Sequence, residues 1–142
     1  MLALDIQHIR MKQHATDKAQ ALQCLVDILV EDQLVTPDYI HGLTGREQQS
    51  ATYLGQGIAI PHGTPQSRQS ILKTGIRLAH FPEGVVWDGE NKIYLAVVIA
   101  AKSDEHLQVL QILTRALIND VADQVKQLSL IHISRAHETD SY

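Results

Sequence analysis

The stretch KIYLAVVIAA, residues 92–101, is almost continuously apolar and rich in β-branched residues. Such a composition favours a β-strand. Because the stretch lacks the polar alternation of a half-exposed strand, both faces of its sheet must be covered. Helices commonly cover both sides of such a sheet. The stretch therefore predicts an α/β fold in which a mixed β-sheet is flanked by helices on both faces.

Further strands are expected on the N-terminal side of this stretch. Residues 75–81, GIRLAHF, alternate in polarity as a strand does, and residues 57–60 form a shorter apolar strand that ends at a proline. Residues 4–11 can form a first strand. The segment 82–89 contains one proline and two glycines, which predicts a turn-rich connection between the strands at 75–81 and 92–101.

Helical patterns occupy most of the remaining chain. Apolar residues recur at helical spacing in 16–33, a second helix is expected from residue 36 to about residue 50, and a third follows residue 103. A short helix is expected over about 120–128. The expected capping residues are Thr16 or Asp17 for the first helix, Thr36 with Pro37 after it for the second, and Ser103 for the third. The apolar stripes contain Leu22, Val26 and Leu29 in the first helix, and Leu110, Leu113 and Leu117 in the third.

The size and composition fit one domain. The chain has 142 residues, of which 44% are hydrophobic, and a net charge of −4 with acids and bases interspersed, which argues against nucleic acid as a partner. The single cysteine, Cys24, excludes an internal disulfide and suits a reducing compartment. No apolar run is long enough to cross a bilayer, so a cytoplasmic protein without membrane insertion is expected. Residues 1–128 form the expected domain, and 129–142 are a polar tail.

One histidine stands in an unusual setting. In GIAIPHGT, residues 57–64, His62 follows an apolar strand and lies between Pro61 and Gly63. The proline restricts the backbone before the histidine, and glycine permits conformations that other residues avoid. A neutral imidazole held in this way can act as a nucleophile and form a covalent intermediate. A purely structural histidine in a turn is the alternative that the local pattern leaves open.

The segment REQQSATYLGQGIAIPHGT, residues 46–64, resembles the active-site segment of the enzyme IIA domain of the mannitol/fructose class of the bacterial sugar phosphotransferase system. The resemblance extends to residues 73–89 and 103–117 and covers most of 1–128. It is closest to the fructose branch, in which this domain often precedes an HPr-like domain. Residues 129–142 depart from the family pattern, because they lack its closing helix.

This resemblance implies a function for His62. In the family, the histidine of the PHG motif takes a phosphoryl group from phospho-HPr, or from a fused HPr-like domain, and passes it to a cysteine of a IIB domain for sugar uptake. Such a relay requires an exposed nitrogen of fixed direction. The resemblance also assigns Arg46 and His106 to the site, where a guanidinium fork and the first turn of a helix suit phosphate oxygens. Weaker candidates for hydrogen bonding or orientation are Thr64, Thr52 and Glu47.

The sequence does not support nucleotide or metal binding. No nucleotide-binding motif is found, and no histidine pairs with Cys24 or an acid at metal-ligand spacing, so neither a cofactor nor a metal is expected. Two rival interpretations remain. One is a regulatory phosphotransferase relay of the nitrogen type, which acts by binding other proteins. The other is a relative in fold alone, without transfer activity, against which the joint presence of His62, Arg46 and His106 argues.

Overall fold

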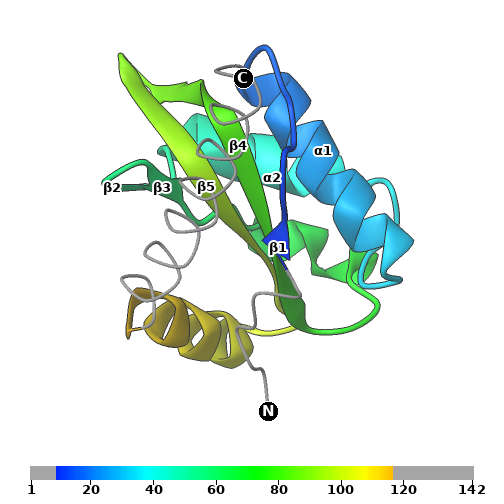
Figure 1. Ribbon diagram of the computed structural model, residues 1–142. Helices are drawn as coiled ribbons and strands as arrows, with labels where there is room; N and C mark the ends of the chain where they lie inside the picture. The colour runs from blue at the N-terminus through cyan, green and yellow to red at the C-terminus, as the bar shows by residue number, and fades with distance from the viewer. Residues whose placement is uncertain (1–8, 117–142) are drawn as a thin grey trace, which may run out of the picture.

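A five-stranded mixed sheet forms the centre of the computed structural model, which describes residues 9–116 (Figure 1). The strand order is β1-β4-β5-β3-β2. Strands β4 and β5 are antiparallel, as are β2 and β3, whereas β1 pairs with β4 and β3 with β5 in parallel. The strands are β1 (Ile9–Arg10), β2 (Tyr53–Gly55), β3 (Ile58–Ala59), β4 (Gly75–Asp88) and β5 (Asn91–Ala100).

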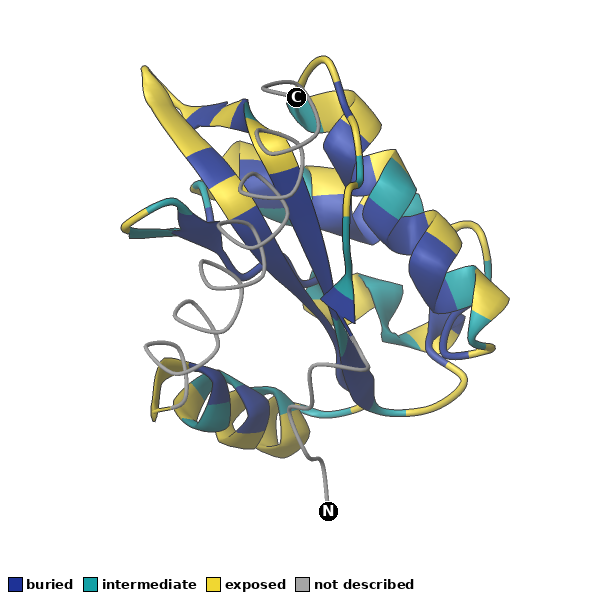
Figure 2. Ribbon diagram, viewed as in Figure 1, coloured by how far each residue is buried: buried dark blue, intermediate teal, exposed yellow. Residues whose placement is uncertain are grey.

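Helices cover both faces of this sheet, which confirms the predicted fold class. Helices α1 (Lys18–Glu31) and α2 (Tyr39–Gln49) lie on one face, and the last described helix, residues 104–116 and called helix 104–116 below, lies on the other (Figures 1 and 2). Along β5, alternate side chains point into the two cores, and residues 95–100 are all buried. The first core contains Ala96, Val98 and Ala100, and the second contains Leu95, Val97, Ile99 and Leu110.

The prediction of a turn-rich connection over 82–89 is wrong. Strand β4 continues to Asp88, so β4 and β5 form one long hairpin. The pairing shifts between His80 and Val85, where several residues of β4 lie opposite Tyr94 alone. Because a bulge of this kind interrupts the ladder, a proline without an N–H group and a glycine with positive φ fit within the strand.

The helix boundaries that fall within the described residues agree with the sequence except at the start of α2. Asp17 caps α1, and its carboxylate accepts a hydrogen bond from the Gln20 amide. The Ser103 hydroxyl accepts one from the His106 amide, as expected for a cap. Helix α2 begins at Tyr39 rather than at residue 37, because the preceding residues form a tighter turn in which the Tyr39 amide donates to the Thr36 carbonyl.

The β2–β3 hairpin was not expected in full. The sequence pattern predicts only one strand, at 57–60, whereas Tyr53–Gly55 also pairs with β3 across a turn in which Gly55, Gln56 and Gly57 all have positive φ. The expected strand at 4–11 is described only at Ile9–Arg10. Leu117, the helix at 120–128, the tail and the domain boundary at 128 lie outside the described residues. Within residues 9–116, no helix is long and apolar enough to span a membrane.

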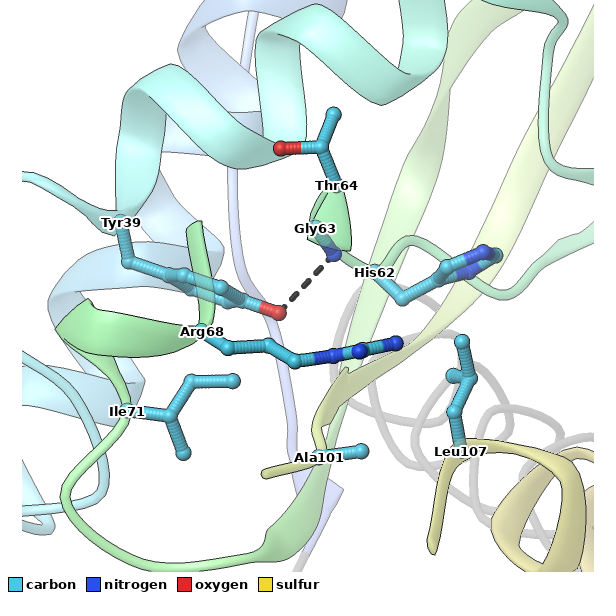
Figure 3. Close-up of a pocket in the computed structure, with 8 residues that line it drawn as sticks. All are labelled: Tyr39, His62, Gly63, Thr64, Arg68, Ile71, Ala101 and Leu107. Carbon is cyan, nitrogen blue, oxygen red and sulfur yellow. Dashed lines mark hydrogen bonds between the residues drawn. The ribbon is translucent and has the colours of Figure 1, made fainter. Parts of the chain in front are cut away.

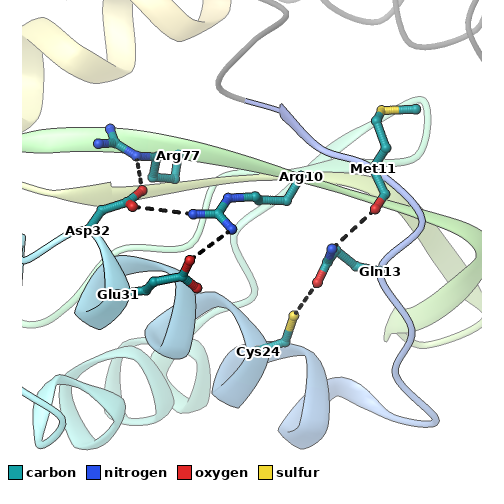
Figure 4. Close-up of polar contacts among 7 residues, drawn as sticks. All are labelled: Arg10, Met11, Gln13, Cys24, Glu31, Asp32 and Arg77. Atoms are coloured by element: carbon teal, nitrogen blue, oxygen red, sulfur yellow. Dashed lines mark hydrogen bonds and ion pairs between the residues drawn. The ribbon is translucent and has the colours of Figure 1, made fainter.

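An ion-pair network ties the first strand to α1 and β4 (Figure 4). The Asp32 carboxylate accepts from Arg77 Nε at 2.6 Å and from Arg10 Nη2 at 3.2 Å. Desolvation alone raises the pKa of Asp32, but the hydrogen bonds and charges of these arginines outweigh it and hold the pKa below its usual value. The network fixes β1 at the edge of the sheet, at a distance from the candidate site.

Candidate functional site

His62 lies where the chain leaves β3 and runs beside the end of β5. It forms an isolated parallel bridge with Ile99, and the Ile99 amide donates to the Pro61 carbonyl at 2.9 Å. A pocket at this end of the sheet brings His62 together with Leu107 of helix 104–116. The backbone pairing therefore fixes the position of His62 beside this helix.

The imidazole of His62 has one nitrogen committed to the backbone. Its Nδ1 lies 3.0 Å from the Ile60 carbonyl. Because a carbonyl oxygen only accepts, Nδ1 carries the proton and Nε2 carries the lone pair. Desolvation lowers the pKa of His62, the Ile60 carbonyl opposes this shift, and the charge of Arg46 adds to it. At neutral pH the ring is therefore a neutral nucleophile.

His62 is more enclosed than the sequence suggests. Only 6% of its surface is exposed, whereas a freely exposed nitrogen was expected for a relay. The residue that follows His62 is closely packed as well. A Cβ atom on Gly63 would lie 2.3 Å from Ser67 Oγ and 2.6 Å from Tyr39 Cε1. Gly63 is thus required by close packing, and not by a positive φ as its setting suggested.

Tyr39, which the sequence did not single out, connects the backbone just after the histidine to the backbone of β5 beside it. Its buried hydroxyl donates to the Ile99 carbonyl and accepts from the Gly63 amide, both at 2.9 Å. Burial raises the pKa of Tyr39 to about 12, so the hydroxyl stays protonated and keeps both hydrogen bonds. These contacts join α2, β5 and the PHG segment at a single atom.

Glu47 and Thr52 bind each other rather than lining the pocket. The buried Glu47 carboxylate accepts from the Thr52 hydroxyl and from the Thr52 amide, the latter at 3.1 Å. It also pairs with Lys18 Nζ at 2.8 Å. The Thr52 carbonyl in turn accepts from the Ile60 amide at 2.9 Å. This arrangement anchors Ile60, whose carbonyl holds the His62 ring.

The other two residues named from the resemblance have partners other than His62 in this structure. Arg46, in the last turn of α2, donates from Nη1 to the Ser50 carbonyl at 2.6 Å, and its charge acts on the pKa of His62. His106 is exposed, and its Nδ1 lies 3.3 Å from Thr74 Oγ1. It lies in the helix that contributes Leu107 to the pocket, but it is not among the pocket-lining residues.

Among the described residues that line the pocket, Arg68 has the cationic side chain, and no sequence pattern pointed to it. It comes from the 3₁₀-helix η2 (Pro65–Ser70), directly after the PHG segment. Its guanidinium ends between His62 and Leu107 (Figure 3). Thr64 also lines the pocket, with its side chain turned away from Arg68 (Figure 3). An arginine six residues after a candidate histidine is unremarkable in sequence, and only the turn of η2 brings its side chain close to the His62 ring.

These features define a class of protein. A neutral imidazole with a fixed Nδ1 offers Nε2 as a nucleophile, and arginines near it suit an anionic group. Within residues 9–116, no group of three or more His, Cys, Asp or Glu side chains is placed to hold a metal ion. The site therefore fits a protein that carries an anionic group on a histidine.

Comparison with known proteins identifies the family. Residues 3–133 match the family described as "Phosphoenolpyruvate-dependent sugar phosphotransferase system, EIIA 2", and the chain belongs to it. The match runs five residues past the boundary expected at 128. The chain is thus a phosphotransferase component, the EIIA phosphoryl carrier, as the resemblance of residues 46–64 implied.

Three similar proteins place the chain within this family. It is 46% identical over 127 residues to the multiphosphoryl transfer protein of Vibrio cholerae, an alignment that covers 89% of this chain and 32% of that protein. The chain thus spans about a third of this relative's length. The crystal structure of IIA mannitol from Escherichia coli is 36% identical, with a TM-score of 0.72, and the match covers 82% of this chain and 84% of that one. The complex of enzyme IIAMTL with phosphorylated IIBMTL from the same species is 34% identical, with a TM-score of 0.76, covering 88% and 89%.

Proposed function

We propose that His62 Nε2 accepts a phosphoryl group from HPr, or from an HPr-like domain, and passes it to a cysteine of a IIB domain for uptake of a fructose-type sugar. The observation that carries this proposal is the hydrogen bond of His62 Nδ1 to the Ile60 carbonyl, which leaves the lone pair on Nε2. The solved complex of a similar IIA protein with a phosphorylated IIB protein supports a IIB domain as the acceptor. The similarity to a multiphosphoryl transfer protein supports a protein donor of phosphoryl groups.

The proposed transfer proceeds in two displacements. The Nε2 lone pair forms a bond to phosphorus, and the bond from phosphorus to the donor atom breaks, with its electron pair kept by the donor. In the second step the thiolate of the IIB cysteine attacks phosphorus, and the electron pair of the P–N bond returns to Nε2. The negative charge on the phosphoryl oxygens requires fixed donors during both steps.

The remaining residues have supporting roles in this proposal. Arg46 leaves the Ser50 carbonyl and donates to the phosphoryl oxygens, and His106 leaves Thr74 to donate from the first turn of helix 104–116. Thr64 lies at the pocket wall, and its hydroxyl reaches the phosphoryl group only after the side chain rotates. Glu47 and Thr52 orient the ring indirectly, because they anchor the segment that holds Ile60.

The sugar is assigned by resemblance, and mannitol is its competitor. The sequence of residues 46–64 most resembles the fructose branch, whereas two of the similar structures are mannitol proteins. The regulatory nitrogen-type alternative is not favoured, because the family description names sugar phosphotransfer. Paired assays with fructose-type and mannitol-type IIB domains separate the two sugars. A faster transfer to the mannitol-type domain would reassign the substrate.

The proposal is tested by incubation with phosphoenolpyruvate, enzyme I and HPr, followed by intact mass and peptide mapping. We expect one acid-labile phosphoryl group, located on His62. His62→Gln should abolish the modification, whereas His41→Gln, a change at an exposed histidine of α2, should leave it intact. Equal labelling of the His62→Gln protein would remove His62 from the reaction.

A further inference from the structure

The guanidinium of Arg68 lies in the same pocket as the His62 ring (Figure 3). Among the described residues that line the pocket, Arg68 is the one with a permanently charged side chain, and its guanidinium points into the space beside the His62 ring (Figure 3). Only 26% of this side chain is exposed. A guanidinium in a partly enclosed pocket loses part of its hydration, and an anion beside it compensates for that loss.

The base of this side chain is fixed relative to His62. The 3₁₀-helix η2 begins one residue after Thr64, and Ser67 Oγ donates to the Thr64 carbonyl at 2.7 Å. The Ile71 amide donates to the Arg68 carbonyl at 3.0 Å. On the other side, Gly42 of α2 packs so closely on Ser67 that an added Cβ would lie 2.3 Å from it. Arg68 is therefore anchored to α2 and to the PHG segment together.

The present partner of Arg68 is a carboxylate that is easily returned to water. Arg68 Nη2 pairs with Asp104 Oδ1, in the first turn of helix 104–116. The Asp104 side chain is 77% exposed, so it loses little solvation in the pair and regains little on release. Ion pairs of this exposure contribute about 0–1 kcal/mol. A phosphoryl group of higher charge, placed deeper beside the same guanidinium, forms the stronger contact.

We propose that Arg68 binds the oxygens of the phosphoryl group on His62, and that Asp104 is the counter-ion which this group displaces. The inference rests on the proposed function, because it takes phosphohistidine as the bound state. Arg68 and Arg46 then approach the phosphoryl group from η2 and α2 respectively. Asp104 weakens the hold of the site on the group and so keeps the carrier able to release it.

The test measures how the phosphoryl group distributes between HPr and the carrier at equilibrium. Arg68→Gln should shift this distribution toward HPr by about tenfold, since a hydrogen bond to a charged group is lost. Arg115→Gln, a change at an exposed arginine of helix 104–116, is the matched control and should leave it unchanged. Asp104→Asn should shift the distribution a few-fold toward the carrier, and this gain should vanish in the Arg68→Gln background.

Two outcomes would overturn the inference. One is an Arg68→Gln protein that is folded, as its amide NMR spectrum shows, and that is phosphorylated on His62 to the same extent at equilibrium with HPr as the unchanged chain. This outcome leaves the proposed function intact. The other concerns the case in which His62 accepts no phosphoryl group, so that the proposed function itself fails and anion binding by Arg68 is tested separately. The Arg68 Nε–H resonance is then followed during titration with inorganic phosphate. A shift that Asp104→Asn enlarges supports anion binding by Arg68, and no shift refutes it.

Discussion

Replacement of Tyr39 by phenylalanine isolates the contribution of one hydroxyl to the geometry of the site. Tyr39→Phe keeps the buried ring and removes two hydrogen bonds, one to the Ile99 carbonyl and one from the Gly63 amide. A buried group left unpaired costs about 1–3 kcal/mol. Gly63 lines the pocket, whereas Ile99 is fully buried, so the unpaired Ile99 carbonyl should account for most of the cost. The free energy of unfolding should therefore fall by about 2 kcal/mol.

Urea denaturation followed by circular dichroism measures this loss directly. The midpoint of thermal unfolding should fall by about 6 °C. Tyr94→Phe is the control, because Tyr94 is 45% exposed, and its change should stay within about 0.5 kcal/mol. The pH dependence gives a second readout. The pKa of Tyr39 is raised to about 12, so stability is lost as pH rises from 10 toward 12, and this loss should shrink in Tyr39→Phe. A loss of stability below about 0.5 kcal/mol would refute the bridging role of the hydroxyl.

Three further predictions concern the residues around this bridge. His62 should titrate below its usual 6.5 in an NMR titration, because desolvation disfavours the cation, and a midpoint above 6.5 contradicts the burial argument. Stability should decline as pH falls below 6.5, since the unfolded chain then binds more protons than the folded one. Arg46→Gln should slow phosphoryl transfer by about 10²–10³-fold with the fold retained, and an unchanged rate would reduce Arg46 to a cap of α2. Gly63→Ala should lower the free energy of unfolding by about 1–3 kcal/mol, measured in urea, since its Cβ has no room; a neutral result would show that Ser67 and Tyr39 move aside.

Much of the fold was predictable because local pattern and tertiary structure agree. The apolar stretch at 92–101 required cover on both faces, and the structure supplies it with α1 and α2 on one side and helix 104–116 on the other. The caps Asp17 and Ser103 also followed from local chemistry. In contrast, β4 crosses a proline and a glycine, and only its pairing with β5 compensates for these strand-breaking residues.

The site was predictable in part for a related reason. His62 could be found because its restraints, Pro61 and Gly63, are adjacent in sequence. Tyr39 and Arg68 could not, because their roles depend on contacts between distant segments. The Tyr39 hydroxyl meets the backbone 24 residues and 60 residues further along the chain. Arg68 is recognised only when η2 is seen to turn its side chain back toward the histidine.

In the proposed role of His62 as the residue that carries the phosphoryl group, its enclosure meets two requirements. The imidazole must be neutral in order to attack, and burial lowers its pKa to that end. The ring must also present the same nitrogen to a donor and to an acceptor, and the Ile60 carbonyl achieves this by holding Nδ1. A ring exposed on all sides would meet neither demand as well, because solvent would stabilise its cation and permit rotation. The slight exposure that remains is sufficient if a partner brings the phosphoryl group to Nε2, since only one face of the ring has to be reached.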